Sequence, residues 1–154
     1  MRAKTVVNLR SLTALTILFL PALLALWLIL RYAVDVPHWD DWGTPGRAYE
    51  MILRGDWNFY HIFFIQSLET RSVIPRIIWV LVSLTVGWHV TVFMVVSWLF
   101  VFLTFVAFLK LIPSGRVRRP LMFRFVALLI GCLLFSSVQW KNWLWATQLV
   151  QFIP

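Results

Sequence analysis

Acidic side chains are scarce in this sequence and confined to one region. The 154 residues include only six Asp and Glu against 14 Lys and Arg, and all six acids fall between residues 35 and 69. Charged residues make up 13% of the chain and hydrophobic residues 61%, whereas a soluble domain usually has about 25% charged residues. This composition excludes an ordinary soluble domain and predicts an all-α integral membrane protein.

Cysteine is almost absent as well. The single cysteine, Cys132, lies within an apolar run, so it cannot form an internal disulfide. Its simplest role is that of a small apolar residue. The three histidines have no zinc-ligand spacing. The net charge of +8 comes from basic residues at the ends of apolar runs. Such residues orient a protein in the membrane, and they do not indicate a nucleic acid partner.

Three apolar runs are long enough to be transmembrane helices. A hydrocarbon core of about 30 Å needs roughly 20 residues at 1.5 Å per residue. The runs predict spans at residues 12–32, 89–110 and 121–138. The fold expected is therefore about three transmembrane helices with further helices outside the bilayer.

Basic residues set the expected orientation. They occur in the N-terminal segment 1–11 and again in the loop 111–120, and the positive-inside rule places both in the cytoplasm. We therefore expect a multi-pass protein of a bacterial-type inner (plasma) membrane with a cytoplasmic N-terminus. Residues 33–88 then form an external or periplasmic loop, and residues 139–154 form an external aromatic segment.

The external loop is expected to hold two amphipathic helices on the outer surface. The first covers residues 45–54, because Thr44-Pro45 is a good helix start and Gly55 a good stop. The second covers residues 72–86. Its apolar part is too short to span a bilayer, and a crossing there would put the loop 111–120 on the wrong side.

Two adjacent carboxylates open this loop, Asp40 and Asp41. Neighbouring carboxylates can bind a divalent cation such as Mg²⁺ or Mn²⁺ through oxygen. Alternatively, one acts as a general base while the other orients a substrate. A third interpretation is structural, because acidic residues are favoured just before a helix N-terminus. The spacing leaves all three open.

Four other residues of the loop are candidates for substrate binding: Glu69, Arg71, His38 and Trp57. Glu69 and Arg71 could contact a sugar hydroxyl and a phosphate, since the planar guanidinium binds two oxygens at once. They could equally be a charge pair at a helix start beside lipid headgroups. Trp57 could stack on a sugar ring, although anchoring at the interface is the commoner role of tryptophan.

The order of these features resembles the N-terminal part of the GT-C superfamily of membrane glycosyltransferases, especially the aminoarabinose and mannosyl transferases that use polyprenyl-phosphate sugar donors. The resemblance is carried by Asp40-Asp41, the helix expected at 45–54 and Gly55-Asp56-Trp57 after it. The second acid is Asp here, where the aminoarabinose type has Glu. Members of the superfamily have roughly eight or more spans, so this chain is expected to be a fragment.

The resemblance implies transfer of a sugar from a polyprenyl-phosphate donor to an unidentified acceptor outside the membrane. Asp40 or Asp41 would be catalytic, and the lipid bilayer and the donor would be the partners. A second hypothesis is a small non-catalytic membrane subunit or assembly protein that uses the loop to bind a partner. A transporter is less compatible, because transporters usually carry ionisable residues inside their spans.

Overall fold

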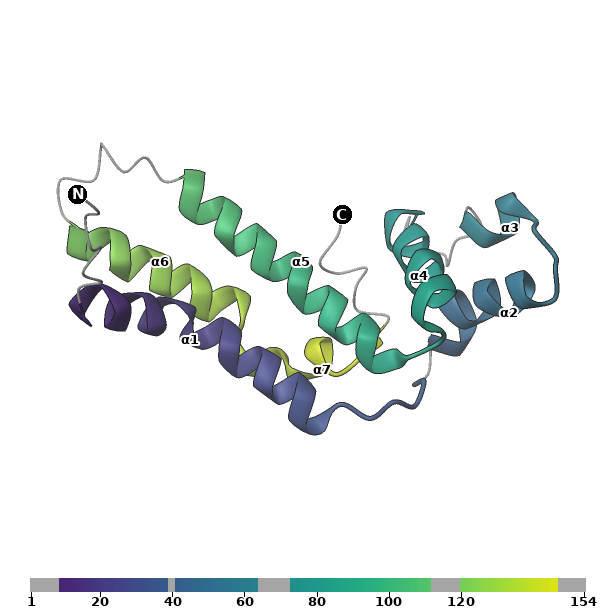
Figure 1. The fold of residues 1–154 in the computed structure, drawn as a ribbon, viewed down its shortest axis with the longest axis horizontal. Coiled ribbons are helices and arrows are strands. Elements are labelled where there is room, and N and C mark those ends of the chain that lie inside the picture. The colour runs from purple at the N-terminus through teal and green to yellow at the C-terminus, as the bar shows by residue number, and fades with distance from the viewer. Residues whose placement is uncertain (1–8, 39–40, 64–72, 112–119, 147–154) are drawn as a thin grey trace, which may run out of the picture.

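Two parts make up the computed structural model, which describes residues 9–38, 41–63, 73–111 and 120–146 (Figure 1). All regular structure in these ranges is helical, so the all-α prediction is confirmed for them. An elongated bundle contains α1 (Leu9–Tyr32), α5 (Val90–Leu111) and α6 (Pro120–Leu134). At one end lies a smaller unit, which we call the end lobe, formed by η1 (Trp42–Gly46), α2 (Arg47–Leu53), α3 (Phe59–Phe63) and α4 (Val73–Val86).

Aromatic rings and small residues form the core of the bundle. Phe105 of α5 is fully buried and makes edge contacts with Phe19 of α1 and Phe135. Gly131 of α6 faces the same ring, and a Cβ there would lie 3.3 Å from its Cζ atom. The absent side chain thus lets α6 approach α5 closely, as small residues do in membrane helix pairs. After α6, η2 (Ser137–Gln139) and α7 (Trp140–Trp143) lead back onto the core, where Trp143 stacks on Phe135.

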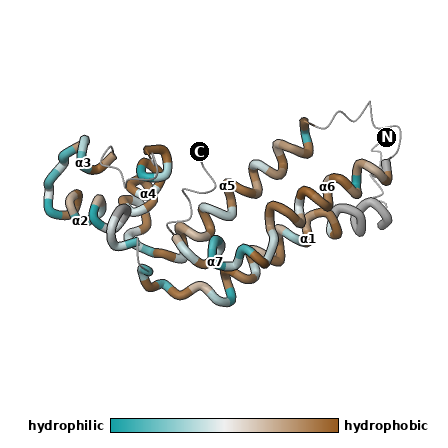
Figure 2. The backbone as a smooth tube through the Cα atoms, turned by 180° about the vertical axis from the view of Figure 1, so that it is seen from behind, coloured by the Kyte–Doolittle hydropathy of each residue, from teal (hydrophilic) through white to brown (hydrophobic). Residues whose placement is uncertain are grey.

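The outside of the bundle is apolar. Figure 2 shows hydrophobic residues along α1, α5 and α6, with hydrophilic ones gathered towards the end lobe. Large side chains on all three helices are more than half exposed, among them Leu30, Leu103 and Phe125. Soluble monomers rarely expose contiguous apolar patches larger than a few hundred Å². In the described residues two helical stretches, Val90–Leu111 and Leu121–Trp143, are long and apolar enough to cross a membrane.

Helical structure in the end lobe begins at Trp42 of η1, before the predicted start at residue 45, whereas the α-helix α2 begins after it, at Arg47. Thr44 and Pro45 do not open an α-helix, because they lie inside the π-helical turn η1 that precedes α2. Gly46 explains this difference, since a Cβ at that position would meet the Asp41 carbonyl oxygen at 2.8 Å. Glycine at this position lets the turn close against that carbonyl.

The predicted stop at Gly55 is confirmed. Gly55 has φ +79°, its N–H donates to the Ile52 carbonyl, and the Asp56 N–H donates to the Met51 carbonyl. These two bonds form a Schellman motif, which satisfies the last carbonyls of a helix with glycine in the left-handed conformation. The chain then reverses through a turn into α3, a short helix that the sequence analysis did not anticipate.

A second left-handed glycine separates α4 from α5. Gly87 has φ +83°, and its N–H donates to the Ser83 carbonyl at 3.0 Å. The apolar sequence therefore divides into two helices, with α4 packed in the end lobe and α5 in the bundle (Figure 1). This division matches the break that the sequence predicts near residues 87–89.

Substituting Gly46 tests the packing of the π-helical turn. We expect Gly46→Ala to lower the free energy of unfolding by about 1–3 kcal/mol, the usual cost of forcing a methyl group into occupied space. Gly43→Ala is the matched control, because a Cβ at Gly43 meets nothing within 4 Å. Thermal unfolding of the detergent-solubilised protein measures both. Equal stability of the two variants would contradict this account of the turn.

Candidate functional site

Asp41 is a fully buried acidic residue at the start of the end lobe. Its relative exposure is 0%. Its Oδ2 accepts a hydrogen bond from the His38 backbone N–H at 2.9 Å, and its own N–H donates to the His38 carbonyl at 3.0 Å. A side chain that reaches back three residues to a backbone N–H is the second half of a capping box. The structure therefore gives Asp41 the cap-and-turn contact that was one of the three interpretations of the pair.

His38 connects this turn to the distant C-terminal part of the chain. Its carbonyl oxygen also accepts a hydrogen bond from the Trp145 indole N–H at 3.1 Å, and the two rings meet edge to face with centroids 5.9 Å apart. Neighbouring Trp42 donates its indole N–H to the Pro37 carbonyl at 3.2 Å. The carbonyls of Pro37 and His38 each accept a hydrogen bond from a tryptophan indole.

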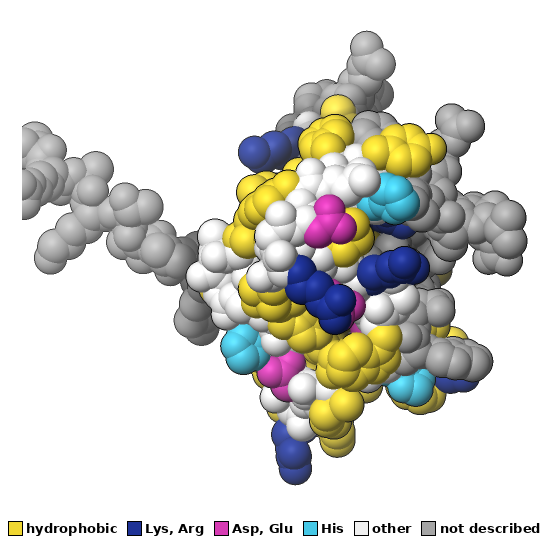
Figure 3. Space-filling model, turned by 90° about the vertical axis from the view of Figure 1, so that its right-hand side faces the viewer, with side chains coloured by type: hydrophobic (Ala, Val, Ile, Leu, Met, Phe, Trp, Pro, Cys, Tyr) yellow, Lys and Arg dark blue, Asp and Glu magenta, His cyan; other side chains and the backbone are white. Residues whose placement is uncertain are grey.

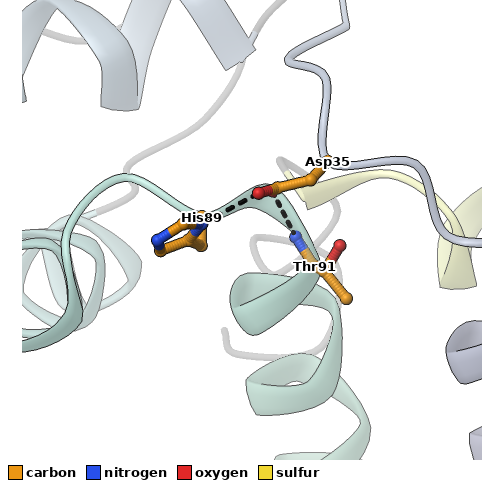
Figure 4. Close-up of polar contacts among 3 residues, drawn as sticks. All are labelled: Asp35, His89 and Thr91. Carbon is orange, nitrogen blue, oxygen red and sulfur yellow. Dashed lines mark hydrogen bonds and ion pairs between the residues drawn. The ribbon is translucent and has the colours of Figure 1, made fainter.

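A second acid, Asp35, joins the end of α1 to the start of α5 (Figure 4). Its Oδ2 lies 2.8 Å from Nδ1 of His89, and its Oδ1 accepts the Thr91 backbone N–H at 3.3 Å. Acceptors at a helix N-terminus satisfy N–H groups that have no partner within the helix. The hydrogen bond from His89, with help from the backbone N–H groups of Thr91 and Val90, lowers the pKa of Asp35 below 3.8, although desolvation opposes the shift.

A polar cleft of about 400 Å³ lies over α2 and α3. Figure 3 views this end of the molecule and shows basic, acidic and histidine side chains gathered there among apolar ones. The cleft is lined by Arg47, Glu50, Met51, Arg54, Asp56, Asn58 and His61. Arg54 and Glu50 form an i,i+4 ion pair at its rim, and both are mostly exposed. Its mixture of donors and acceptors suits a hydroxylated or charged ligand, but Asp41 does not line it.

One face of α4 carries three buried residues with polar side-chain atoms. We call these residues the α4 stripe: Arg76, Trp79 and Ser83. All three residues are at most 5% exposed. In the described part of the chain, the Arg76 Nε, the Trp79 Nε1 and the Ser83 Oγ have no hydrogen-bond partner. Arg76 reaches only the Ile62 carbonyl, 3.4 Å from its Nη1, and burial lowers the pKa of its guanidinium. A buried donor without a partner costs about 1–3 kcal/mol, so the stripe is an expensive feature of the fold.

Sequence analysis missed the α4 stripe as a candidate site. The signal available was Arg76 itself, because an arginine placed among apolar residues of a helix is often functional. Its spacing from Trp79 and Ser83, three and seven residues on, puts the three on one helix face.

The structure brings together only some of the residues that the sequence singled out. Asp41 and His38 are in direct contact, whereas Trp57 is 63% exposed in the turn after α2. Asp40, Glu69 and Arg71 lie outside the described residues. The predicted metal site at Asp40 and Asp41 is untested for this reason. Within the described ranges, no group of three or more His, Cys, Asp or Glu side chains could hold a metal.

Comparison with protein-family models, with curated proteins and with solved structures finds no match to this chain.

The Asp35 contacts predict a loss of stability in acid. Because the folded-state pKa of Asp35 is below its unfolded value, its contribution is present above about pH 4 and is lost as the pH falls through the folded-state pKa. Both Asp35 and His89 are about half exposed, so the effect should stay below about 1 kcal/mol.

Thermal unfolding of the wild type and Asp35→Asn between pH 6 and pH 3 measures this contribution. We expect the variant to be less stable at pH 6, and the difference to shrink towards pH 3. Asp56→Asn, in the exposed turn after α2, is the control and should change little at any pH. A difference between wild type and Asp35→Asn that grows in acid would refute the assignment.

Proposed function

We propose that this chain supplies the first spans and the outer loop of a membrane glycosyltransferase. The enzyme would transfer a sugar from a polyprenyl-phosphate donor to an acceptor at the outer face of the membrane. The proposal rests on the resemblance to GT-C enzymes and on the placement of a buried carboxylate where the apolar bundle meets a polar lobe.

In this proposal α1, α5 and α6 cross the bilayer and the end lobe lies outside it. The exposed apolar side chains of the bundle support the crossing. With 14 residues, α4 is about 21 Å long, short of a hydrocarbon core of about 30 Å. Its buried Arg76 contacts the Ile62 carbonyl of α3 in the end lobe.

The observation that carries the proposal is the burial of Asp41. A carboxylate is costly to remove from water unless it is hydrogen-bonded, and Asp41 is 0% exposed with its Oδ2 held by the His38 backbone N–H. Asp41 also follows directly on Asp40, so a second carboxylate is available next to it in the chain.

The chemistry would proceed by a single displacement. Asp40 or Asp41 takes the proton of an acceptor hydroxyl, whose oxygen forms a bond to the anomeric carbon of the sugar. The bond between that carbon and the phosphate oxygen breaks, and its electron pair leaves with the lipid phosphate. Arg71, and Arg76 in the α4 stripe, would offset the charge of the departing phosphate, since preorganised donors stabilise developing charge. The polar cleft over α2 and α3 would receive the hydroxylated acceptor.

A second candidate is a non-catalytic membrane subunit or assembly protein. The reciprocal hydrogen bonds between Asp41 and His38 favour it, because they give Asp41 a structural role without chemistry. The end lobe would then be a docking unit for a partner protein.

Two substitutions of Asp41 separate these candidates. Asp41→Asn keeps an oxygen that can accept the His38 N–H but cannot take a proton, whereas Asp41→Ala removes both functions. In the complete gene product, in its native membrane, we expect Asp40→Asn and Asp41→Asn each to reduce sugar transfer at least about 100-fold, as loss of a general base does. Membrane insertion should be unchanged.

Asp35→Asn is the control, because Asp35 belongs to the same loop but its carboxylate binds groups at the start of α5. The transfer rate of this variant should stay within about threefold of wild type, a change in activation free energy of under about 1 kcal/mol. Full transfer by both Asp40→Asn and Asp41→Asn would eliminate the catalytic role. Loss of partner binding in Asp41→Ala, with Asp41→Asn normal, would instead support the subunit.

A further inference from the structure

An apolar groove runs along the seam between α1 and α6. It consists of two adjoining clefts that share Ile17 and Leu128, with volumes of about 680 Å³ and 540 Å³. Ligand sites typically enclose about 300–1,000 Å³, so each cleft has room for a ligand. In Figure 1 the seam extends from the end of the bundle near the N-terminus towards α7.

The two clefts differ in charge. The first, which we call the Arg124 groove, is lined by Leu18, Leu121, Met122 and Phe125 as well as Ile17 and Leu128, and Arg124 is the charged side chain among its described lining residues. The second, the serine groove, has Ser136 and Ser137 near its far end and no charged residue among those described. Among the described lining residues, a cation therefore lies at one end of the groove and the rest of the lining is mostly apolar.

We propose that the Arg124 groove binds an anionic phospholipid of the cytoplasmic leaflet. One acyl chain would lie along Leu18, Leu128 and Phe125, and the phosphate would accept hydrogen bonds from the Arg124 guanidinium. Arginine suits this role because its planar fork binds two phosphate oxygens at once. This inference rests on the membrane orientation in the proposed function, which places the α6 N-terminus at the cytoplasmic side.

Charge complementarity selects this occupant. The Arg124 end of the bundle also carries Lys110 in the last turn of α5, and basic pockets between transmembrane helices on the cytoplasmic side bind anionic headgroups. A soluble anion would find almost no polar group besides Arg124 in the described lining. A zwitterionic lipid has no net negative charge, so its headgroup would attract the guanidinium less strongly.

Native mass spectrometry of the purified full chain tests the proposal. The protein is released from nanodiscs made of equal parts phosphatidylglycerol and phosphatidylethanolamine, and the bound lipids are counted. We expect a preference for phosphatidylglycerol that falls about fivefold in Arg124→Gln, the effect of one basic residue at a membrane surface. Lys110→Gln, which removes one charge at the same end but does not line the groove, should lower the preference less than Arg124→Gln does.

Leu128→Trp provides an independent variant, because it fills the groove without altering charge and should reduce the number of bound lipids of both kinds. Absence of a phosphatidylglycerol preference in the wild type, or equal losses in Arg124→Gln and Lys110→Gln, would overturn the proposal. A lipid-free dimer would assign the groove to a second copy and overturn it too. The assay contains no sugar donor, so failure of the transferase proposal would leave its result unchanged, whereas a chain that does not enter nanodiscs would overturn both.

Discussion

At Gly87 the backbone takes φ +83°, and there α4 ends before α5 begins. Without this break the apolar stretch from residue 73 to residue 111 would form one helix about 58 Å long. The end lobe would then lack α4, which packs against its other helices. Asp35 fixes the new direction of α5, because its carboxylate holds His89 and the first N–H groups of that helix from the far end of α1. The arrangement of bundle and lobe thus depends on one glycine and one acid.

The end lobe holds several polar groups at a cost in free energy. The buried carboxylate of Asp41 accepts a hydrogen bond from the His38 backbone N–H. The α4 stripe buries three polar atoms that have no hydrogen-bond partner among the described residues. A lobe selected only for stability would carry apolar residues at these positions, since a half-satisfied buried network is worse than an apolar one. Asp41 accepts the His38 backbone N–H and donates its own N–H to the His38 carbonyl. It is the residue at which the structural and catalytic interpretations divide.

The lengths of the apolar runs and the positions of glycine predict the fold better than they predict the site. The 20-residue apolar runs, the stop at Gly55 and the break at Gly87 follow from hydrophobic length and glycine conformation, which are local properties. The start of α2 was misplaced because the contact between Gly46 and the Asp41 carbonyl belongs to a wide turn that residue types do not reveal. Burial of Asp41 and Arg76, the contact of His38 with Trp145 and the Asp35–His89 bond depend on tertiary packing. Spacing along the chain could not have predicted them.

The proposed topology places α4 along the outer surface of the membrane and the end lobe outside it. Cysteine labelling in intact cells tests it directly, in a Cys132→Ser background, with Asp56→Cys in the end lobe and Lys110→Cys at the far end of α5. We expect a membrane-impermeant maleimide to label Asp56→Cys in intact cells and Lys110→Cys only after permeabilisation. If α4 crossed the bilayer, α5 would run in the opposite direction. Both positions would then be labelled from the same side, which would contradict the account.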